Sequence, residues 1–188
     1  MSKIGRKPIQ LNGVTVDIKG QEVSYKGPKA SGVYHLPSEL SARVQDTSLY
    51  ITPAQDKQKM SSRQVSGVNR AWGLARALLA NELSGAAQEF EKILEINGLG
   101  YKAAVVGNKI ILTLGFSHKI EEEIPAGIAS VEIDKSGQKV KIRSSNKNLL
   151  GDFCSNIREL REPEPYKGKG IKLSTEVIFR KSAGKGKK

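Results

Sequence analysis

Cysteine and histidine are scarce in this chain of 188 residues, which contains one cysteine, Cys154, and two histidines, His35 and His118. A single thiol cannot form an intrachain disulfide, and zinc sites built from cysteine use more than one. This usage is typical of proteins in a reducing compartment. Cys154 follows the apolar spacing of a predicted helix, so we expect a core residue rather than a nucleophile.

Long apolar runs are absent as well. No segment approaches the roughly 20 apolar residues that a membrane helix requires, and Met1 to Pro8 lack the apolar stretch of a signal peptide. We therefore expect a cytoplasmic protein. Hydrophobic residues make up 38% of the chain and aromatic residues 5%, which is little for one large core and favours two small ones.

Basic residues outnumber acidic ones, with 31 Lys and Arg against 19 Asp and Glu and a formal net charge of +12. The surplus is concentrated in residues 1–30, 57–76 and 161–188, and residues 57–76 contain no acid. Like charges at this density repel one another in a compact chain, so a polyanionic partner is expected. Their clustering favours RNA binding over general solubility.

Alternating apolar and polar residues predict short strands in both halves of the chain. The strands are expected near residues 14–18, 23–25, 33–36, 42–44 and 49–52, and again near 90–96, 101–106, 109–114, 120–124, 131–133 and 140–142. Turn pairs such as Gly20-Gln21, Gly107-Asn108 and Ser136-Gly137 separate neighbouring strands.

An apolar stripe at helical spacing follows each set of strands. The stripes are Val65, Val68, Trp72, Ala75 and Leu79 in the first half, and Leu150, Phe153, Ile157 and Leu160 in the second. The first stripe predicts a helix from about residue 58 to residue 83, with Ser84-Gly85 as its end.

The two halves share this order of elements, which indicates an internal duplication. Three residues of the first half recur at an offset of 88 residues: Gly27, Pro37 and Leu40 match Gly115, Pro125 and Ile128. We predict an α+β fold of two tandem small domains, each an antiparallel or mixed sheet packed against one main helix. The domains are expected at 1–84 and 85–161, followed by a basic extension at 162–188, where prolines end the helical pattern.

The basic segments supply the candidate RNA-binding residues, because lysines neutralise phosphates, glycines allow close approach and a tyrosine can stack on a base. The candidates are Tyr166, Lys167, Gly168, Lys169, Gly170, Lys172, Arg180 and Lys181 in the extension, Arg63 and Arg70 on the first helix, and Lys3, Arg6 and Lys7 in an N-terminal arm. A frayed terminus is an equal alternative for that arm, and a solubilising tail is the better explanation of residues 182–188.

No catalytic constellation is evident. Gly98-Leu-Gly100 resembles half of a nucleotide fingerprint, but it lies between predicted strands and opens no helix. The adjacent carboxylates Glu121 to Glu123 point to alternate faces of a strand. We expect no enzyme, no metal and no cofactor; a hydrolase that used these glutamates would lose its activity in a triple alanine variant.

Six motifs, in order along essentially the whole chain, carry a resemblance to a known family. They lie at residues 2–9, 23–29, 98–103, 114–118, 123–127 and 163–171, and include Leu114-Gly-Phe-Ser-His118 and Pro163-Glu-Pro-Tyr-Lys-Gly-Lys-Gly-Ile171. Together they resemble the bacterial form of the universal ribosomal protein six family of the large subunit. Lys119 and Glu162 depart from it, since proline is common at both positions.

The resemblance implies two tandem copies of one α+β domain and a structural role in the ribosome. It implies binding to large-subunit ribosomal RNA near the factor-binding centre and the stalk base, beside neighbouring large-subunit proteins. It places residues 166–170 on the RNA-contacting motif and implies no membrane or small-molecule partner. A free RNA-binding regulator or assembly factor with the same fold is the alternative, and a plastid-encoded version is compatible with the bacterial pattern.

Overall fold

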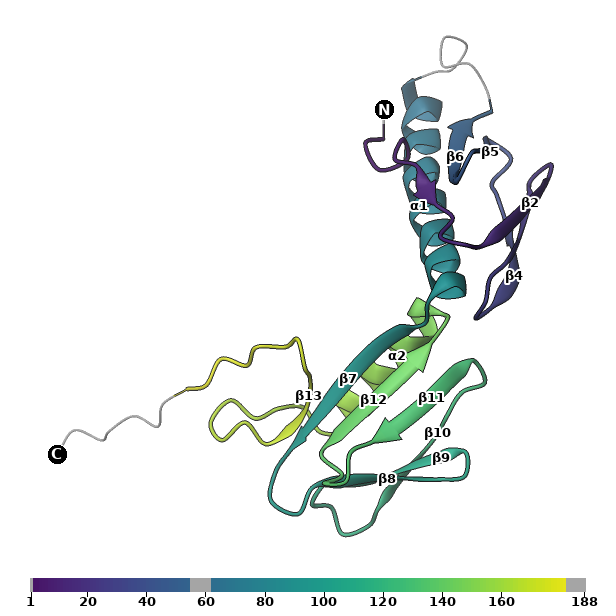
Figure 1. The fold of residues 1–188 in the computed structure, drawn as a ribbon. Helices are drawn as coiled ribbons and strands as arrows, with labels where there is room; N and C mark the ends of the chain where they lie inside the picture. The colour runs from purple at the N-terminus through teal and green to yellow at the C-terminus, as the bar shows by residue number, and fades with distance from the viewer. Residues whose placement is uncertain (1, 55–61, 182–188) are drawn as a thin grey trace. The chain divides into compact units, whose positions relative to one another are not determined.

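The computed structural model describes residues 2–54 and 62–181, and the chain divides into two compact units, residues 1–89 and 90–188 (Figure 1). In the first unit the described elements are β1 (Ile9–Gln10), β2 (Thr15–Lys19), β3 (Glu22–Lys26), β4 (Ser31–His35), β5 (Leu40–Gln45), β6 (Ser48–Pro53) and α1 (Ser62–Ala87). In the second they are β7 (Phe90–Asn97), β8 (Lys102–Val106), β9 (Lys109–Thr113), β10 (Ile120–Glu123), β11 (Ile128–Ile133), β12 (Lys139–Ser144), α2 (Lys147–Glu159) and β13 (Gly170–Leu173).

In the described part of the chain, each unit consists of two antiparallel sheets and one helix. The first unit has the strand orders β1-β6-β5 and β2-β3-β4, and the second has β11-β12-β7-β13 and β10-β9-β8. Strands β7 to β12 and α2 therefore repeat β1 to β6 and α1, element by element. The duplicated α+β fold predicted from the sequence is confirmed, with every described ladder antiparallel and two sheets per unit in place of one.

A proline marks the crossing between the two sheets of each unit. Because proline has no N–H to donate to a ladder, it ends β4 and β10. A short turn follows in both copies: Leu40 N donates to Pro37 O at 2.9 Å, and Ile128 N donates to Pro125 O at 3.2 Å. The constant offset in the sequence thus reflects a proline turn that occurs in both units, where the chain passes from one sheet to the other.

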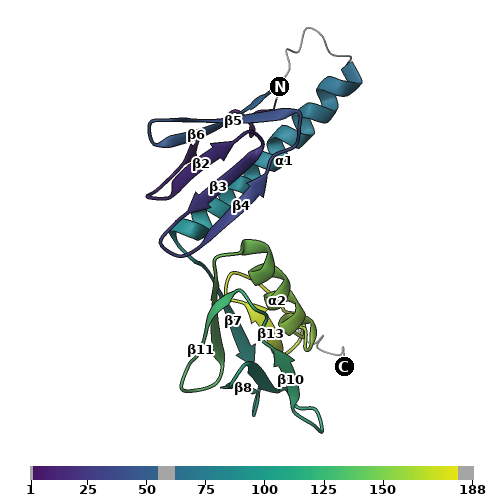
Figure 2. The same cartoon turned by 90° about the vertical axis from the view of Figure 1, so that its right-hand side faces the viewer.

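The apolar stripes of both helices face the cores as predicted. On α1 the buried residues include Val68, Trp72, Ala75 and Leu79, and on α2 they are Leu150, Phe153, Cys154 and Ile157. Figure 2 shows β2, β3 and β4 beside α1, and α2 beside β7 and β13. None of the helices among the described residues is both long and apolar enough to span a membrane.

Helix α1 runs past the predicted end at Ser84-Gly85 and finishes at Ala87. The helix continues because tertiary contacts bind its last turn: Lys29 N donates to Ala86 O at 3.0 Å, and Gly27 packs directly against Ala86. The predicted boundary at residue 84 therefore lies inside the helix. The predicted start near residue 58 lies outside the described residues.

Strand β13 was not predicted from the sequence. Residues 170–173, assigned to the extension, pair with β7, with Ile171 opposite Ile96 and Lys172 opposite Glu95. Ile171 is fully buried in the core of the second unit. The chain beyond α2 thus returns to the sheet before it continues toward the C-terminus. The short strand β1 was also missed.

Candidate nucleic-acid interface

The segment that leads from α2 into β13, residues 163–170, forms a closed loop, which we call the basic loop. Two backbone bonds close it: Glu164 N donates to Lys169 O at 2.8 Å, and Gly168 N donates to Glu164 O at 2.9 Å. Gly168 occupies the turn with a φ of 69°, a conformation that glycine adopts without strain. The side chains of Lys167 and Lys169, on either side of Gly168, are exposed.

Backbone contacts also fix the base of the basic loop. Ile171 N donates to Arg161 O at 2.8 Å, which joins the two ends of the loop. Gly170, with a φ of 134°, lies so close to the backbone at the other end of the loop that an added Cβ would be 2.5 Å from Glu162 O. The loop is therefore held at its neck by the chain itself, and β13 anchors it to the sheet.

The segment after β13 folds back over the basic loop. Arg158 of α2 holds Glu176 with two bonds, Nε to Oε2 at 3.0 Å and Nη2 to Oε1 at 2.8 Å. Further along, Lys181 N donates to Pro165 O at 2.9 Å. A Cβ placed on Gly168 would be 3.1 Å from Arg180 Nη2, so the Arg180 guanidinium lies against the turn of the loop.

An open pocket of about 450 Å³ lies beside the loop. It is lined by Asn97, Gly98, Leu99, Gln138, Lys167, Gly168, Lys169 and Arg180. Leu99 is 97% exposed at its rim. The predicted candidates Lys167, Gly168, Lys169 and Arg180 are thus brought together in one place, while the Tyr166 ring, 56% exposed, is on the same loop.

Lys167, Lys169 and Arg180 at this pocket have no acid partner among the residues that the structure describes. Within residues 2–54 and 62–181, no carboxylate oxygen lies within 4.0 Å of the side-chain nitrogens of Lys167, Lys169 or Arg180. Lys172, predicted with them, is different: its Nζ is 2.9 Å from Glu95 Oε2, the residue opposite it on β7. The structure therefore separates Lys172 from the other lysines of the motif.

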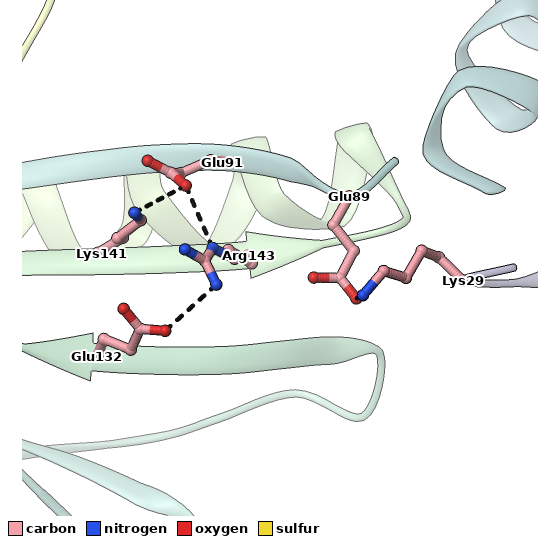
Figure 3. A network of polar contacts seen from close by, with 6 residues as sticks. All are labelled: Lys29, Glu89, Glu91, Glu132, Lys141 and Arg143. Carbon is pink, nitrogen blue, oxygen red and sulfur yellow. Dashed lines mark hydrogen bonds and ion pairs between the residues drawn. The ribbon is translucent and has the colours of Figure 1, made fainter. Parts of the chain in front are cut away.

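Two cations of β12, Lys141 and Arg143, are also paired with acids of the same sheet. Glu91 accepts from Lys141 Nζ at 3.0 Å and from Arg143 Nε at 3.2 Å, and Arg143 also reaches Glu132 at 3.3 Å (Figure 3). These hydrogen bonds, from Lys141 first, lower the pKa of Glu91. Among the described residues, Lys141 and Arg143 thus have acid partners within the sheet, unlike Lys167, Lys169 and Arg180.

In the first unit, the predicted basic residues lie on α1 and the N-terminal arm. Arg63, Arg70, Lys3, Arg6 and Lys7 are all exposed. The arm is packed on α1 rather than frayed, as three contacts show. Gly5 lies against the Trp72 indole, and Arg76 donates to Lys7 O at 3.1 Å and to Pro8 O at 2.8 Å. Arg76 thus binds the arm itself.

A second group of planar side chains was missed from the sequence. Phe116 and His118 lie in the turn between β9 and β10, with ring centroids 6.4 Å apart and an interplanar angle of 27°. The Arg161 guanidinium lies over the Phe116 ring, 5.1 Å from its centroid. The sequence signal that could have identified this group was an aromatic residue and a histidine two positions apart in a turn that contains glycine. Arg161 lies too far along the chain for a local sequence pattern to connect it with them.

The residues considered as catalytic candidates have structural roles instead. Burial raises the pKa of the Cys154 thiol to about 11, so the thiol stays protonated and unreactive at neutral pH. Gly98 makes a turn closed by Tyr101 N donating to Gly98 O at 3.2 Å, and Glu121 pairs with Lys109 at 3.3 Å. Across the described ranges, no three His, Cys, Asp or Glu residues gather as a metal site would require.

Comparison with known proteins gives consistent results. The sequence profile of the family described as Ribosomal protein L6 matches residues 97–173. The large ribosomal subunit protein uL6 of Oleidesulfovibrio alaskensis is 43% identical over 189 residues, covering 100% of this chain and 99% of that protein. The proteins of the same name from Dinoroseobacter shibae (98% of this chain, 99% of the relative) and Crocosphaera subtropica (100% of both) are each 40% identical.

Proposed function

This chain belongs to the family of large ribosomal subunit protein uL6, and we propose that it binds large-subunit ribosomal RNA chiefly through the basic loop and Arg180. Members of this family are structural and non-enzymatic, so the chain is a ribonucleoprotein component that serves translation as part of the large subunit. Its bacterial relatives imply a place on cytoplasmic ribosomes.

The observation that carries the proposal is the grouping of Lys167, Lys169 and Arg180 around Gly168, without an acid partner among the described residues. Each cation that meets a phosphate releases a condensed counterion, which is the main driving force of such binding. Because the loop is closed by backbone bonds before any RNA arrives, little conformational entropy is lost on binding. Gly168 lets the RNA backbone come close to the loop.

Tyr166 and Lys181 extend this contact. The exposed Tyr166 ring can stack on a base or a ribose, and Lys181 is tied to the loop through the carbonyl of Pro165. We assign Lys172 a smaller part, because Glu95 already matches its charge. In the first unit, the exposed cations Arg63, Arg70, Lys3, Arg6 and Lys7 form a second, weaker RNA contact.

For the position in the subunit, we propose the region of the factor-binding centre and the stalk base, beside other large-subunit proteins. The support is the resemblance of the whole motif at residues 163–171 to that of the family. Crosslinking from Tyr166, Lys167 and Lys169 of the basic loop, mapped nucleotide by nucleotide, tests this position. Crosslinks confined to RNA far from the stalk base would contradict it.

The central test replaces both Lys167 and Lys169 by alanine. We expect weaker binding to deproteinised bacterial large-subunit RNA, and a plot of log affinity against log salt whose slope is smaller by about two, one unit for each lost phosphate contact. Lys172→Ala is the matched control, since its partner is Glu95, and should change the slope less. An unchanged slope in the double variant would show that these lysines do not touch phosphate.

Co-sedimentation with mature large subunits in moderate salt tests the structural role itself. A constituent protein stays with the subunit. Release of the chain under these conditions would instead support a free regulator or an assembly factor with the same fold.

A further inference from the structure

Exposed aromatic side chains are confined to one part of this molecule. The chain has four Phe, five Tyr and one Trp, and all ten lie within the described residues. Only Phe116, Tyr166 and Phe179 are exposed, at 41%, 56% and 90%, and all three belong to the second unit. An aromatic ring left in water forgoes the free energy of burial, so an exposed ring beside a cation is typical of a surface that binds a planar partner.

Phe116 is the most organised of the three, because two other planar groups accompany it. The His118 ring is stacked near it at 27°, and the Arg161 guanidinium lies over it at 5.1 Å. His118 and Arg161 are exposed as well. Among the described residues, no carboxylate oxygen lies within 4.0 Å of Arg161. The guanidinium therefore makes a cation–π contact with the Phe116 ring in place of an ion pair with an acid.

The turn that carries Phe116 is supported from below by Tyr101. A Cβ added to Gly115 would lie 3.0 Å from the Tyr101 ring, and one added to Gly98 would lie 2.7 Å from it. The ring of Tyr101 is thus in close contact with both glycine turns. Since Gly98 lines the pocket beside Lys167 and Lys169, Tyr101 connects the Phe116 turn to that pocket.

Arg161 makes a second connection. Its guanidinium covers Phe116, while its carbonyl accepts from Ile171 N at 2.8 Å at the neck of the basic loop. The stacked cluster and the basic loop are therefore joined through Arg161 within the second unit. One RNA element can place its phosphates on the loop and its bases on the cluster.

We propose that Phe116, His118 and Arg161 form a stacking platform for an unpaired RNA base. The base extends the existing stack of planar groups, and the Arg161 charge strengthens the contact. The partner is an unpaired nucleotide of a loop or bulge, because bases inside an RNA duplex have their faces covered by their neighbours. This inference rests on the proposed RNA-binding function and adds base stacking to its phosphate contacts.

The test separates stacking from charge. Phe116→Leu keeps an apolar side chain but removes the aromatic face, and Phe116→Tyr keeps that face. With deproteinised bacterial large-subunit RNA, we expect Phe116→Leu to weaken binding roughly 5- to 150-fold, the range that base–aromatic stacking supports, with the salt slope unchanged. Phe116→Tyr should bind the RNA as tightly as the unmodified chain does. Val106→Ala, at a site 59% exposed on β8, should also leave the affinity unchanged.

Spectroscopy gives an independent measurement that does not depend on the leucine variant. Phe116→Trp introduces a reporter whose emission should be quenched when a base stacks on it, against the background of buried Trp72. Val44→Trp, at a site 40% exposed in the first unit, controls for quenching by nonspecific association. Equal quenching at both sites, or none at residue 116 on saturation with RNA, overturns the platform.

The outcomes also separate the two proposals. If Phe116→Leu binds as tightly as the unmodified chain while the Lys167 and Lys169 double variant loses salt slope, the platform is refuted and the RNA-binding loop stands. If the double variant keeps its slope and Phe116→Leu loses affinity, the platform stands and the loop is refuted.

Discussion

Gly170 offers the sharpest test of how the basic loop is built. Its φ of 134° is a conformation that residues with a side chain rarely adopt. A Cβ at this position would also lie 2.5 Å from Glu162 O and 2.7 Å from the Cα atom of Pro163. Both obstacles are backbone atoms, which cannot move aside as the end of a flexible side chain can. Gly170→Ala should therefore open the neck of the loop.

The expected cost has two parts. A residue with a side chain held at such a φ costs about 1–3 kcal/mol, and overpacking against fixed atoms typically costs about 1–3 kcal/mol more. We expect Gly170→Ala to destabilise the second unit by roughly 2–6 kcal/mol. The pairing of β13 with β7 should be lost first, because Gly170 begins that strand.

Two other glycines provide matched controls. Gly107 has a φ of 60°, and among the described residues beyond its chain neighbours none has an atom within 4 Å of an added Cβ, so Gly107→Ala reports the backbone cost alone. Gly151 lies inside α2 with only Lys92 Nζ nearby, at 3.7 Å, so Gly151→Ala should stabilise by about 0.5–1 kcal/mol.

Urea unfolding followed by far-UV circular dichroism measures the stability of these variants. Fluorescence of Trp72, the single tryptophan, follows the first unit separately and should not change. Hydrogen exchange at the Ile171 amide reports the neck directly, because this amide bonds to Arg161 O. If Gly170→Ala costs no more than Gly107→Ala and leaves Ile171 protected, the close approach does not constrain the loop and the reasoning fails.

Two further predictions concern the core of the first unit and the segment that follows β13. Leu79→Ala removes a fully buried side chain of α1 and should cost about 2–5 kcal/mol in unfolding followed by Trp72 fluorescence; Leu74→Ala, at a site 61% exposed, should cost less than about 0.5 kcal/mol, and equal losses would contradict the core assignment. The Arg158 guanidinium lowers the pKa of Glu176 below its ordinary value of 4.5. A lowered carboxyl pKa stabilises the fold above pH 4.5, and this contribution is lost as the pH falls through the folded pKa. The Leu173 amide, which donates to Glu176 Oε2 at 3.3 Å, should therefore shift in NMR spectra below pH 4.5 in the unmodified chain but not in Glu176→Gln; the same shift in both would exclude Glu176 as its cause.

Periodicity along the sequence was sufficient to predict most of the elements. The apolar stripe from Val68 to Leu79 predicts the buried face of α1, and alternation predicts most of the strands to within a few residues. The repeat of Gly27 and Pro37 at Gly115 and Pro125 indicates the duplication. These signals are local, since each arises from the period of a helix or a strand within one segment.

The candidate interface was only partly accessible from sequence. Composition identified Lys167, Lys169 and Arg180 as basic residues of one segment, but it treated Lys172 as their equal. The pairing of β13 with β7 decides the difference, because it sets Lys172 opposite Glu95. The local sequence around a lysine cannot indicate that its partner is a carboxylate 77 positions earlier in the chain.

The sequence by itself determined the two repeated α+β domains, the positive segments and the motif of the basic loop, because helical and strand periods, charge and glycine spacing are properties of neighbouring residues. Only the tertiary structure decided that the predicted basic extension returns to the sheet through β13, that Arg180 lies against Gly168, and that Arg161 covers Phe116. Each of these contacts joins residues whose separation in the chain follows no period, and each forms because closing the second core brings those segments together.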